Sequence, residues 1–271
     1  MSLSKHDLDT LSPGRWLNDA VINEFCALIE RRNNLDNCFP SIKCFATFFW
    51  KKYKNDGFPG VVRWTKNCVL NEVEILLFPH HDAKKKHWSI GVADLVRKRV
   101  LWFDSLNCNR QQEISDLSLY VAKLLSDPSA IYWPAFHGKC PQQLNGDDCG
   151  VFMLINAELL SKRVGLNYNN DETTINNARQ LITVALTSKC LSPCPWNAEA
   201  ASEFDPERQS PTENIEITLY SGDISSLRSY FHRHSKDKKR CKPYRLALNN
   251  RQLKIFPTQV LQLFKEHGIE L

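Results

Sequence analysis

The residue of this chain best placed for nucleophilic chemistry is Cys149, at the start of a predicted helix. Its surroundings read PQQLNGDDCGVF, a loop that presents the cysteine and then continues as an apolar helical pattern. The positive end of the helix dipole and the unpaired N–H groups of the first turn stabilise a thiolate there. Asp147 or Asp148 can cap this helix. Gly146 and Gly150 allow tight turning and close approach of another backbone.

A histidine and an aspartate upstream share one predicted hairpin. A run with strand character follows His87, and a second run ends at Asp104, 17 residues after the histidine. If the runs are antiparallel and joined by a turn at residues 95–98, residue 94 pairs with 99 and residue 89 with 104. His87 and Asp104 then share a face at one end of the hairpin. An odd-numbered loop without a bulge would put them on opposite faces.

Together these side chains have the types needed for acyl transfer to a thiol. Cys149 attacks an acyl carbon, His87 takes the thiol proton and returns it to the leaving amine, and Asp104 holds the imidazole in the useful tautomer. The oxyanion that forms needs preorganised donors, which the Cys149 backbone N–H and the Gln143 side-chain amide can supply. Each residue taken singly has an ordinary structural role open to it. The set with ordered roles predicts a cysteine hydrolase.

The elements that must position these residues follow from the apolar periodicity. A helix lies within residues 12–32, with Asn18 or Asp19 as its cap. Further helices are predicted over 41–54, 111–125, 149–160 and 173–187. Strands are predicted over 74–78, 88–94, 100–104 and 130–136.

The bulk composition is that of an ordinary soluble globular protein. The chain has 271 residues, of which 42% are hydrophobic and 24% charged, with a net charge of +5. It shows no basic stripe interleaved with aromatics, no apolar run of membrane-spanning length and no signal-peptide layout. We therefore expect neither a nucleic-acid nor a membrane partner.

The ten cysteines are scattered, and no export signal accompanies them. Reduced intracellular thiols are the expectation, with Cys26 and Cys44 as small core residues on helical faces. The pair Cys190 and Cys194 has the only metal-like spacing, and the prolines around Cys194 favour a plain loop. We predict no metal and no organic cofactor.

Four separated segments resemble the ubiquitin-like-protein proteases, the family of SUMO/sentrin-specific and adenain-like cysteine proteases. They are WLND with VIN in 16–23, HWS at 87–89, FDSL at 103–106, and QQLNGDDCG at 142–150. Their order along the chain, histidine before aspartate before cysteine, is the order of that family. The resemblance covers about residues 10–165.

The resemblance implies a catalytic site and a fold. It assigns His87, Asp104 and Cys149 as the triad and Gln143 to the oxyanion hole. It also implies an α+β, papain-like cysteine protease fold of the adenain type, in which a small mixed sheet is flanked by helices. Cys149 would lie on the central helix, with His87 and Asp104 on the sheet.

The same resemblance implies a substrate-binding tunnel. Trp16 and Trp88 would roof it, and Asp19 belongs to the same substrate-binding set. Only glycines, which lack side chains, can pass beneath two indoles, so such a tunnel selects a diglycine terminus by steric exclusion.

The implied reaction is hydrolysis of the bond after the C-terminal Gly-Gly of a ubiquitin-like modifier, in deconjugation or precursor processing. SUMO is the first expectation, and ubiquitin and NEDD8 remain open. Two alternatives also remain open: an acetyltransferase of the same clan, and a module that binds a modifier without cutting it. We expect a monomer in the nucleus or cytoplasm, or delivered into a host cell if the chain is a pathogen effector.

The composition shifts near residue 192 to a stretch rich in Pro, Glu and Ser. We therefore predict a catalytic domain over residues 1–200. Residues 201–271 are predicted to be a linker and a C-terminal extension of unknown role.

Overall fold

The computed structural model describes residues 3–66 and 68–191. The predicted linker and C-terminal extension at 201–271 lie outside the described residues. Within the described part, no helix has both the length and the apolar character needed to cross a membrane.

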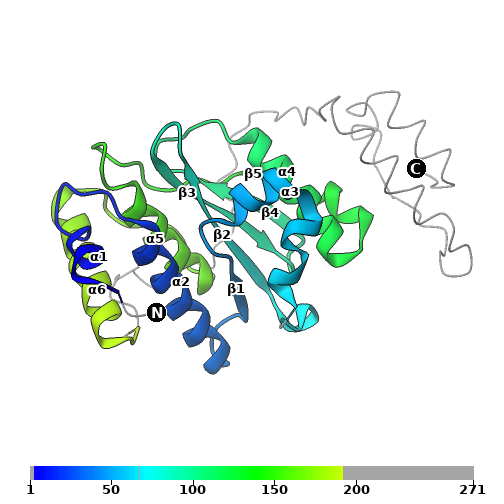
Figure 1. The fold of residues 1–271 in the computed structure, drawn as a ribbon, viewed down its shortest axis with the longest axis horizontal. Coiled ribbons are helices and arrows are strands. Elements are labelled where there is room, and N and C mark those ends of the chain that lie inside the picture. The colour runs from blue at the N-terminus through cyan, green and yellow to red at the C-terminus, as the bar shows by residue number, and fades with distance from the viewer. Residues whose placement is uncertain (1–2, 67, 192–271) are drawn as a thin grey trace, which may run out of the picture. The chain divides into compact units, whose positions relative to one another are not determined.

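A five-stranded sheet in the order β1-β2-β3-β4-β5 forms the middle layer (Figure 1). The strands are β1 (Ile42–Cys44), β2 (Ile75–Asp82), β3 (His87–Asp94), β4 (Arg99–Phe103) and β5 (Ala135–His137). The three central strands pair antiparallel, whereas β1 and β5 add in parallel at the two edges. The predicted mixed sheet with flanking helices is confirmed.

Helices cover both faces of this sheet, as Figure 1 shows. They are α1 (Lys5–Asp9), α2 (Asp19–Leu35), α3 (Phe49–Val61), α4 (Gln111–Leu125), α5 (Cys149–Ser161) and α6 (Glu172–Ser188). Alternate strand residues feed two cores, since Ile90 and Val92 pack with α2, α5 and α6, whereas Ala93 packs with α3 and α4. Both faces of the central strands are therefore buried.

Helix α5 is the central helix that the sequence predicts. All of its residues are buried, as expected for a mostly apolar helix that is packed on every side, and its buried Glu158 is paired with Arg32 and Lys162. The predicted cap is wrong: Asp148 is the N-cap residue, but its side chain makes no capping hydrogen bond. Its carboxylate instead accepts hydrogen bonds from Arg179 and Asn145. Asn18, by contrast, caps α2 as expected by accepting from the Val21 N–H.

Two predicted elements differ from the structure. Residues 42–44 form strand β1 rather than the start of a helix, so Cys44 is a buried strand residue. Side chains of α2 stabilise this strand: Asn34 bonds both the N–H and the C=O of Ile42, and Glu30 accepts from the Cys44 N–H. These partners are distant in sequence, so local periodicity does not reveal them.

The predicted strand over 130–136 is shorter than expected. Its first part lies in a 3-10 turn, Pro128–Tyr132, before β5 begins at Ala135. Pro128 stands in the first turn, and the Asp127 side chain accepts from the Ser129 N–H. This cap starts a helical turn where the hydrophobic pattern alone indicated a strand.

A close approach occurs at Gly150, but the nearest atoms belong to the Leu17 side chain and not, as the sequence predicts, to a backbone. A Cβ at this position would lie 2.9 Å from the Cβ of Leu17, so the segment that carries Trp16 packs directly on the first turn of α5. The same prediction is wrong for Gly146, where an added Cβ would meet no atom within 4 Å.

Candidate active site

The hairpin of β3 and β4 brings His87 and Asp104 together. Asp94 pairs with Arg99 and Ile90 with Phe103, which is the register expected from the even-numbered loop. His87 Nε2 lies 2.7 Å from Asp104 Oδ1, and both side chains are buried. Of the two loop registers considered from the sequence, the structure has the even-numbered one, in which His87 and Asp104 lie on the same face.

Cys149 joins this pair from the first residue of α5. It is 2% exposed, and its thiol is close enough to the His87 imidazole to help raise the pKa of that ring. Because Nε2 of the ring is bonded to Asp104, Nδ1 is the nitrogen left for the thiol. Burial lowers the pKa of His87, but the hydrogen bonds with Asp104 and Cys149 outweigh burial and raise it to about 9. A protonated imidazole beside the sulfur favours the reactive thiolate.

Asp104 is held at both carboxylate oxygens. Oδ1 also accepts the Leu106 N–H at 2.9 Å, and Oδ2 accepts Nε of Arg110 at 2.9 Å. Burial alone would raise the pKa of Asp104, but the bonds from His87, Leu106 and Arg110 lower it below its ordinary value. The carboxylate therefore stays ionised. Sequence reasoning missed Arg110, because nothing in its local spacing marks it as a partner of Asp104.

The side chain of Gln143 is held between Ser105, which follows Asp104, and Asn145 in the loop before Cys149. Ser105 Oγ donates to Gln143 Oε1 at 2.7 Å, and the Gln143 N–H donates to the Ser105 carbonyl at 2.9 Å. Gln143 Nε2 donates to the Asn145 carbonyl at 2.7 Å. These contacts fix which end of the amide is the donor end. An amide nitrogen carries two N–H groups, so one remains beyond the bond to Asn145.

A second buried arginine, also missed, organises the loop before Cys149. Arg179 on α6 donates from Nε to Asp148 Oδ1 at 3.0 Å. It also donates to the carbonyls of Ser12 at 3.2 Å and Arg15 at 2.9 Å. One guanidinium thus holds together the loop of the nucleophile and the segment leading to Trp16. These partners come from two stretches that are distant from Arg179 in sequence, so no local pattern could indicate them.

The two predicted tryptophans are tied to that same region. The Trp16 Nε1–H donates to the Gly146 carbonyl at 2.9 Å, and the Trp88 Nε1–H donates to the Leu17 carbonyl at 3.0 Å. Trp16 is 49% exposed, whereas Trp88 is 5% exposed. The structure therefore places both indoles beside the loop that carries Cys149.

Asp19 is exposed at the start of α2. Burial chiefly lowers the pKa of His81, and the Asp19 carboxylate is close enough to oppose that shift. The His81 ring lies 4.6 Å from the Trp88 ring, between centroids. The ring of His81 therefore relates Asp19 to the region of Trp88.

The family model described as "Ulp1 protease family, C-terminal catalytic domain" matches residues 15–193. This chain belongs to that family. The matched range contains the predicted site residues, from Trp16 to Cys149.

Individual relatives agree with this membership. Sentrin-specific protease 2 of Homo sapiens is 36% identical over 170 residues, which cover 60% of this chain and 28% of that protein. Ubiquitin-like-specific protease 1 of Saccharomyces cerevisiae is 31% identical over 163 residues, 58% of this chain and 25% of that protein. The alignments thus span little more than a quarter of these relatives' own length.

Solved Ulp1 structures share the fold. The C-terminal Ulp1 protease domain in complex with Smt3, the yeast ortholog of SUMO, aligns with a TM-score of 0.62 at 28% identity. The alignment covers 69% of this chain and 83% of that one. Ulp1 with its catalytic cysteine oxidised to a sulfonic acid aligns with the same TM-score and identity over 69% and 84% of the two chains.

The described part of this Ulp1-family chain contains one cluster of metal-ligand side chains, His87, Asp104 and Cys108, with ligand atoms within 4.8 Å of one another. His87 and Asp104 are already bonded to each other, and Asp104 also binds Arg110. The arrangement therefore favours a hydrogen-bonded triad over a metal site. Of the metal-like pair, Cys190 is exposed and Cys194 lies outside the described residues.

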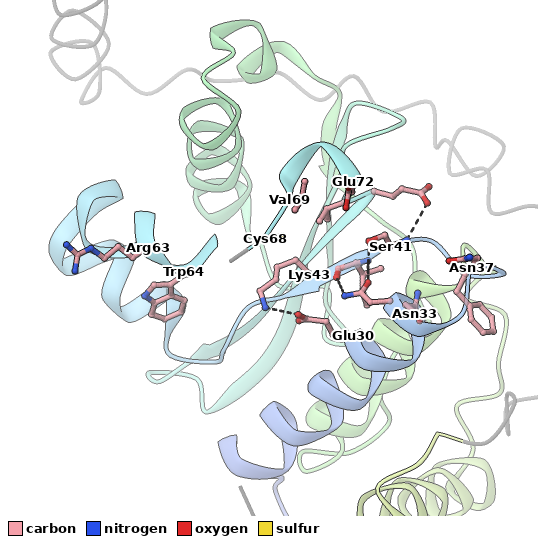
Figure 2. Close-up of a pocket in the computed structure, with 15 residues that line it drawn as sticks. Glu30, Asn33, Asn37, Ser41, Lys43, Arg63, Trp64, Cys68, Val69 and Glu72 are labelled. Atoms are coloured by element: carbon pink, nitrogen blue, oxygen red, sulfur yellow. Dashed lines mark hydrogen bonds and ion pairs between the residues drawn. The ribbon is translucent and has the colours of Figure 1, made fainter. Parts of the chain in front are cut away.

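A cavity of about 730 Å³ lies elsewhere, between α2, β1 and the 3-10 turns that precede β2. Figure 2 shows Lys43 directed toward Glu30 there, an ion pair with a 2.8 Å separation. None of the predicted site residues lines this cavity. The Ulp1-family site is thus built by hydrogen-bonded side chains at the end of the sheet, away from the residues of this cavity.

The elevated pKa of His87 predicts the alkaline limit of activity. If the imidazolium donates the proton to the leaving amine, kcat/KM falls as pH rises through about 9. An unperturbed histidine would place this fall near pH 6.5. Because Asp104 raises the pKa, Asp104→Asn moves the alkaline limb to lower pH. A pH profile of kcat/KM for both enzymes checks this, and an unmoved limb contradicts it.

Proposed function

We propose that this chain is a cysteine protease that hydrolyses the bond after the C-terminal Gly-Gly of a ubiquitin-like modifier. The observation that carries the proposal is the buried series Cys149–His87–Asp104 at the first turn of the central helix. The bond cut is an isopeptide to lysine in conjugates or a peptide in precursors.

The proposed reaction has two stages. The Cys149 thiolate attacks the carbonyl carbon of the terminal glycine, and the His87 imidazolium gives its proton to the departing amine. The resulting thioester is then attacked by water, from which neutral His87 takes a proton, and the modifier leaves with a free carboxylate. Asp104 keeps the imidazole oriented and stabilises its charge throughout.

The oxyanion of each tetrahedral intermediate faces two proposed donors. Cys149 is the first residue of α5, so its N–H has no acceptor within the helix. The second donor is the remaining N–H of Gln143, whose amide is held in one orientation by Ser105 and Asn145. The helix start and the bonds to Ser105 and Asn145 support two preorganised donors, which is what makes such a site effective.

Replacing Gln143 tests the second donor. Gln143→Ala should lower kcat by about 10²–10³-fold, the usual loss for one oxyanion donor. KM should change little, because the bond forms with the intermediate and not with the bound substrate. Steady-state kinetics with a diglycine reporter measure both. An unchanged kcat removes Gln143 from the oxyanion hole.

SUMO is the modifier that we propose first. A Ulp1 domain whose structure aligns with this chain was solved in complex with Smt3, the yeast ortholog of SUMO, and several relatives are sentrin-specific proteases. Ubiquitin and NEDD8 are the competing modifiers. All proposed site residues come from a single chain, so a monomer suffices.

The two competing functions predict different chemistry at the same cysteine. An acetyltransferase of the same clan would pass an acyl group from Cys149 to an amine and leave Gly-Gly bonds intact. A binding module would hold the modifier and show no activated thiolate. The triad described above has no role in a module that only binds.

The deciding experiment offers the purified protein SUMO, ubiquitin and NEDD8, each with an electrophile in place of the terminal carboxylate. We expect Cys149 to be labelled fastest by the SUMO probe. Equal reaction with all three probes would remove the proposed SUMO preference. Labelling by none of them, together with no cleavage of Gly-Gly precursors, would reject the proposed function.

A shortened chain tests the proposed domain boundary. All proposed catalytic residues precede residue 150, and the family match ends at residue 193. A chain ending near residue 200 should therefore keep its kcat/KM on a small diglycine reporter, with a thermal melt run alongside. It should lose activity on full modifiers if the extension docks them. Loss of reporter cleavage with an unchanged melt would place part of the active site beyond residue 200.

A further inference from the structure

The buried arginine Arg110 bonds the carboxylate oxygen of Asp104 that His87 does not use. The side chain of Arg110 is 2% exposed and donates from Nε to Asp104 Oδ2 at 2.9 Å. Asp104 itself is 1% exposed at its side chain, so water does not replace a missing partner there. Without Arg110, Oδ2 would be a buried charged oxygen with no donor, which is costly.

The same guanidinium also reaches the strand that pairs with His87. Nη1 donates to Asp82 Oδ2 at 2.8 Å, and Asp82 stands directly opposite His87 in the register of β2 and β3. Asp82 Oδ1 accepts the N–H groups of Lys84 and Lys85 in the turn before His87. Arg110 therefore connects the acid of the triad to the turn that precedes its base.

Arg110 is in turn fixed from a third direction. Its backbone N–H donates to His137 Nε2 on β5 at 3.2 Å. Its Nη2 has no hydrogen-bond partner among the described residues, so burying this side chain carries a cost that its two carboxylate bonds must offset. Packing alone therefore does not explain why a charged side chain is buried at this position.

We propose that Arg110 is a positioning residue for catalysis, which holds the Asp104 carboxylate in the orientation that aligns the His87 imidazole with Cys149. This inference rests on the proposed protease function. Arg110 contacts neither the thiol nor the substrate, and it acts only through Asp104. An arginine suits this task, because its rigid planar guanidinium donates from Nε to Asp104 and from Nη1 to Asp82, and so holds the two carboxylates at a fixed separation.

The charged and titratable groups around Arg110 and Asp104 come from five elements and two loops. They are His80 and Asp82 on β2, His87 on β3, Cys108 after Asp104, Glu113 on α4, His137 on β5, Cys140 before the nucleophile loop, and Cys149 on α5. Any variant that removes the guanidinium changes the field at all of them. The test therefore needs a cation-preserving variant as well as a neutral one.

The first measurement is steady-state turnover of a diglycine reporter by Arg110→Met and Arg110→Lys, normalised to folded enzyme. Arg110→Met should lower kcat by about 10- to 100-fold, the scale of a small misplacement of catalytic groups, and leave KM almost unchanged. Arg110→Lys should also lose kcat, although less, because one ammonium cannot reproduce the fork between Asp104 and Asp82. If the methionine variant does not fold, the lysine variant decides.

Arg163 offers a matched control. It also bridges two carboxylates, Asp94 at 2.7 Å and Glu74 at 3.1 Å, and its side chain is 18% exposed. Asp94 ends β3, the strand that His87 begins, so this pair lies at the far end from the triad. Arg163→Met should lower the melting temperature without changing kcat. If Arg110 were only structural, its variants would behave in the same way.

The second measurement repeats the change in an enzyme that carries Asp104→Asn. If Arg110 acts through Asp104, Arg110→Met should have little further effect on kcat in that background, as expected for residues in one network. An equal loss of kcat in both backgrounds overturns the proposal. An unchanged kcat of either Arg110 variant in the otherwise wild-type chain also overturns it.

A substrate-free readout separates this inference from the proposed function. The rate at which iodoacetamide alkylates Cys149 at pH 7, followed by mass spectrometry of the Cys149 peptide, reports the thiolate–imidazolium pair. It should fall in Arg110→Met and stay unchanged in Arg163→Met. If no modifier is cleaved by the wild-type chain yet this dependence holds, the proposed function fails and the positioning role stands. If modifiers are cleaved and the alkylation rate does not change in either Arg110 variant, the positioning role fails.

Discussion

Cys149→Ala should lower the turnover of a Gly-Gly substrate by about 10⁶-fold, the loss seen when a catalytic nucleophile is removed. The reason is that Cys149, at the first turn of α5, carries the thiol that lies beside His87. Binding of the modifier should be almost unchanged, because a thiol contributes little to a large protein interface. Turnover and a binding isotherm, measured on the same preparation, separate the two effects.

Cys26→Ala is the matched control for that experiment. Cys26 is also 2% exposed but lies on α2, in the core, away from His87. It should lose some stability and keep its kcat. Turnover above background in Cys149→Ala, with contaminating protease excluded, would show that the nucleophile lies elsewhere.

A modifier that ends in Ala-Ala should be cleaved about 30- to 10⁴-fold more slowly than its Gly-Gly form, since each of the two added methyl groups in a tightly packed site costs about 1–3 kcal/mol. The two indoles proposed to enclose the diglycine tail are held in place by hydrogen bonds. Trp16 is bonded to the Gly146 carbonyl and Trp88 to the Leu17 carbonyl. Leu17 in turn packs against Gly150, beside the nucleophile.

The measurement is kcat/KM for the two modifiers, whose folded bodies are identical. Trp16→Ala serves as the control, because removing one indole should narrow the difference between the substrates. Comparable cleavage of both modifiers by the wild-type chain would contradict selection by steric exclusion.

The catalytic hairpin could be predicted because its geometry depends on local facts. An even-numbered loop between two runs of strand residues sets the register, and the register sets which side chains share a face. The start of α5 was equally accessible, because a loop followed by an apolar run marks a buried helix. These local signals predicted the shared face of His87 and Asp104 and the position of Cys149 at a helix start, whereas the meeting of Cys149 with the pair was inferred from their complementary roles and from the family resemblance.

The supporting residues could not be predicted in this way. Arg110 and Arg179 meet their partners only after the chain has folded, and no periodicity marks a charged residue that will be buried. The bond from Ser105 to Gln143 likewise joins positions 38 apart in sequence. Strand β1 was mistaken for a helix for the same reason, since its partners lie on α2 and β2.

The side chains of α2 that complete β1 also affect how this sheet meets other molecules. Asn34 offers Ile42 a donor and an acceptor, as a neighbouring strand would, and Glu30 takes the Cys44 N–H. An extended peptide that approaches this margin therefore finds these backbone groups already occupied. The margin is closed to strand addition and to the edge-to-edge aggregation that open sheets risk.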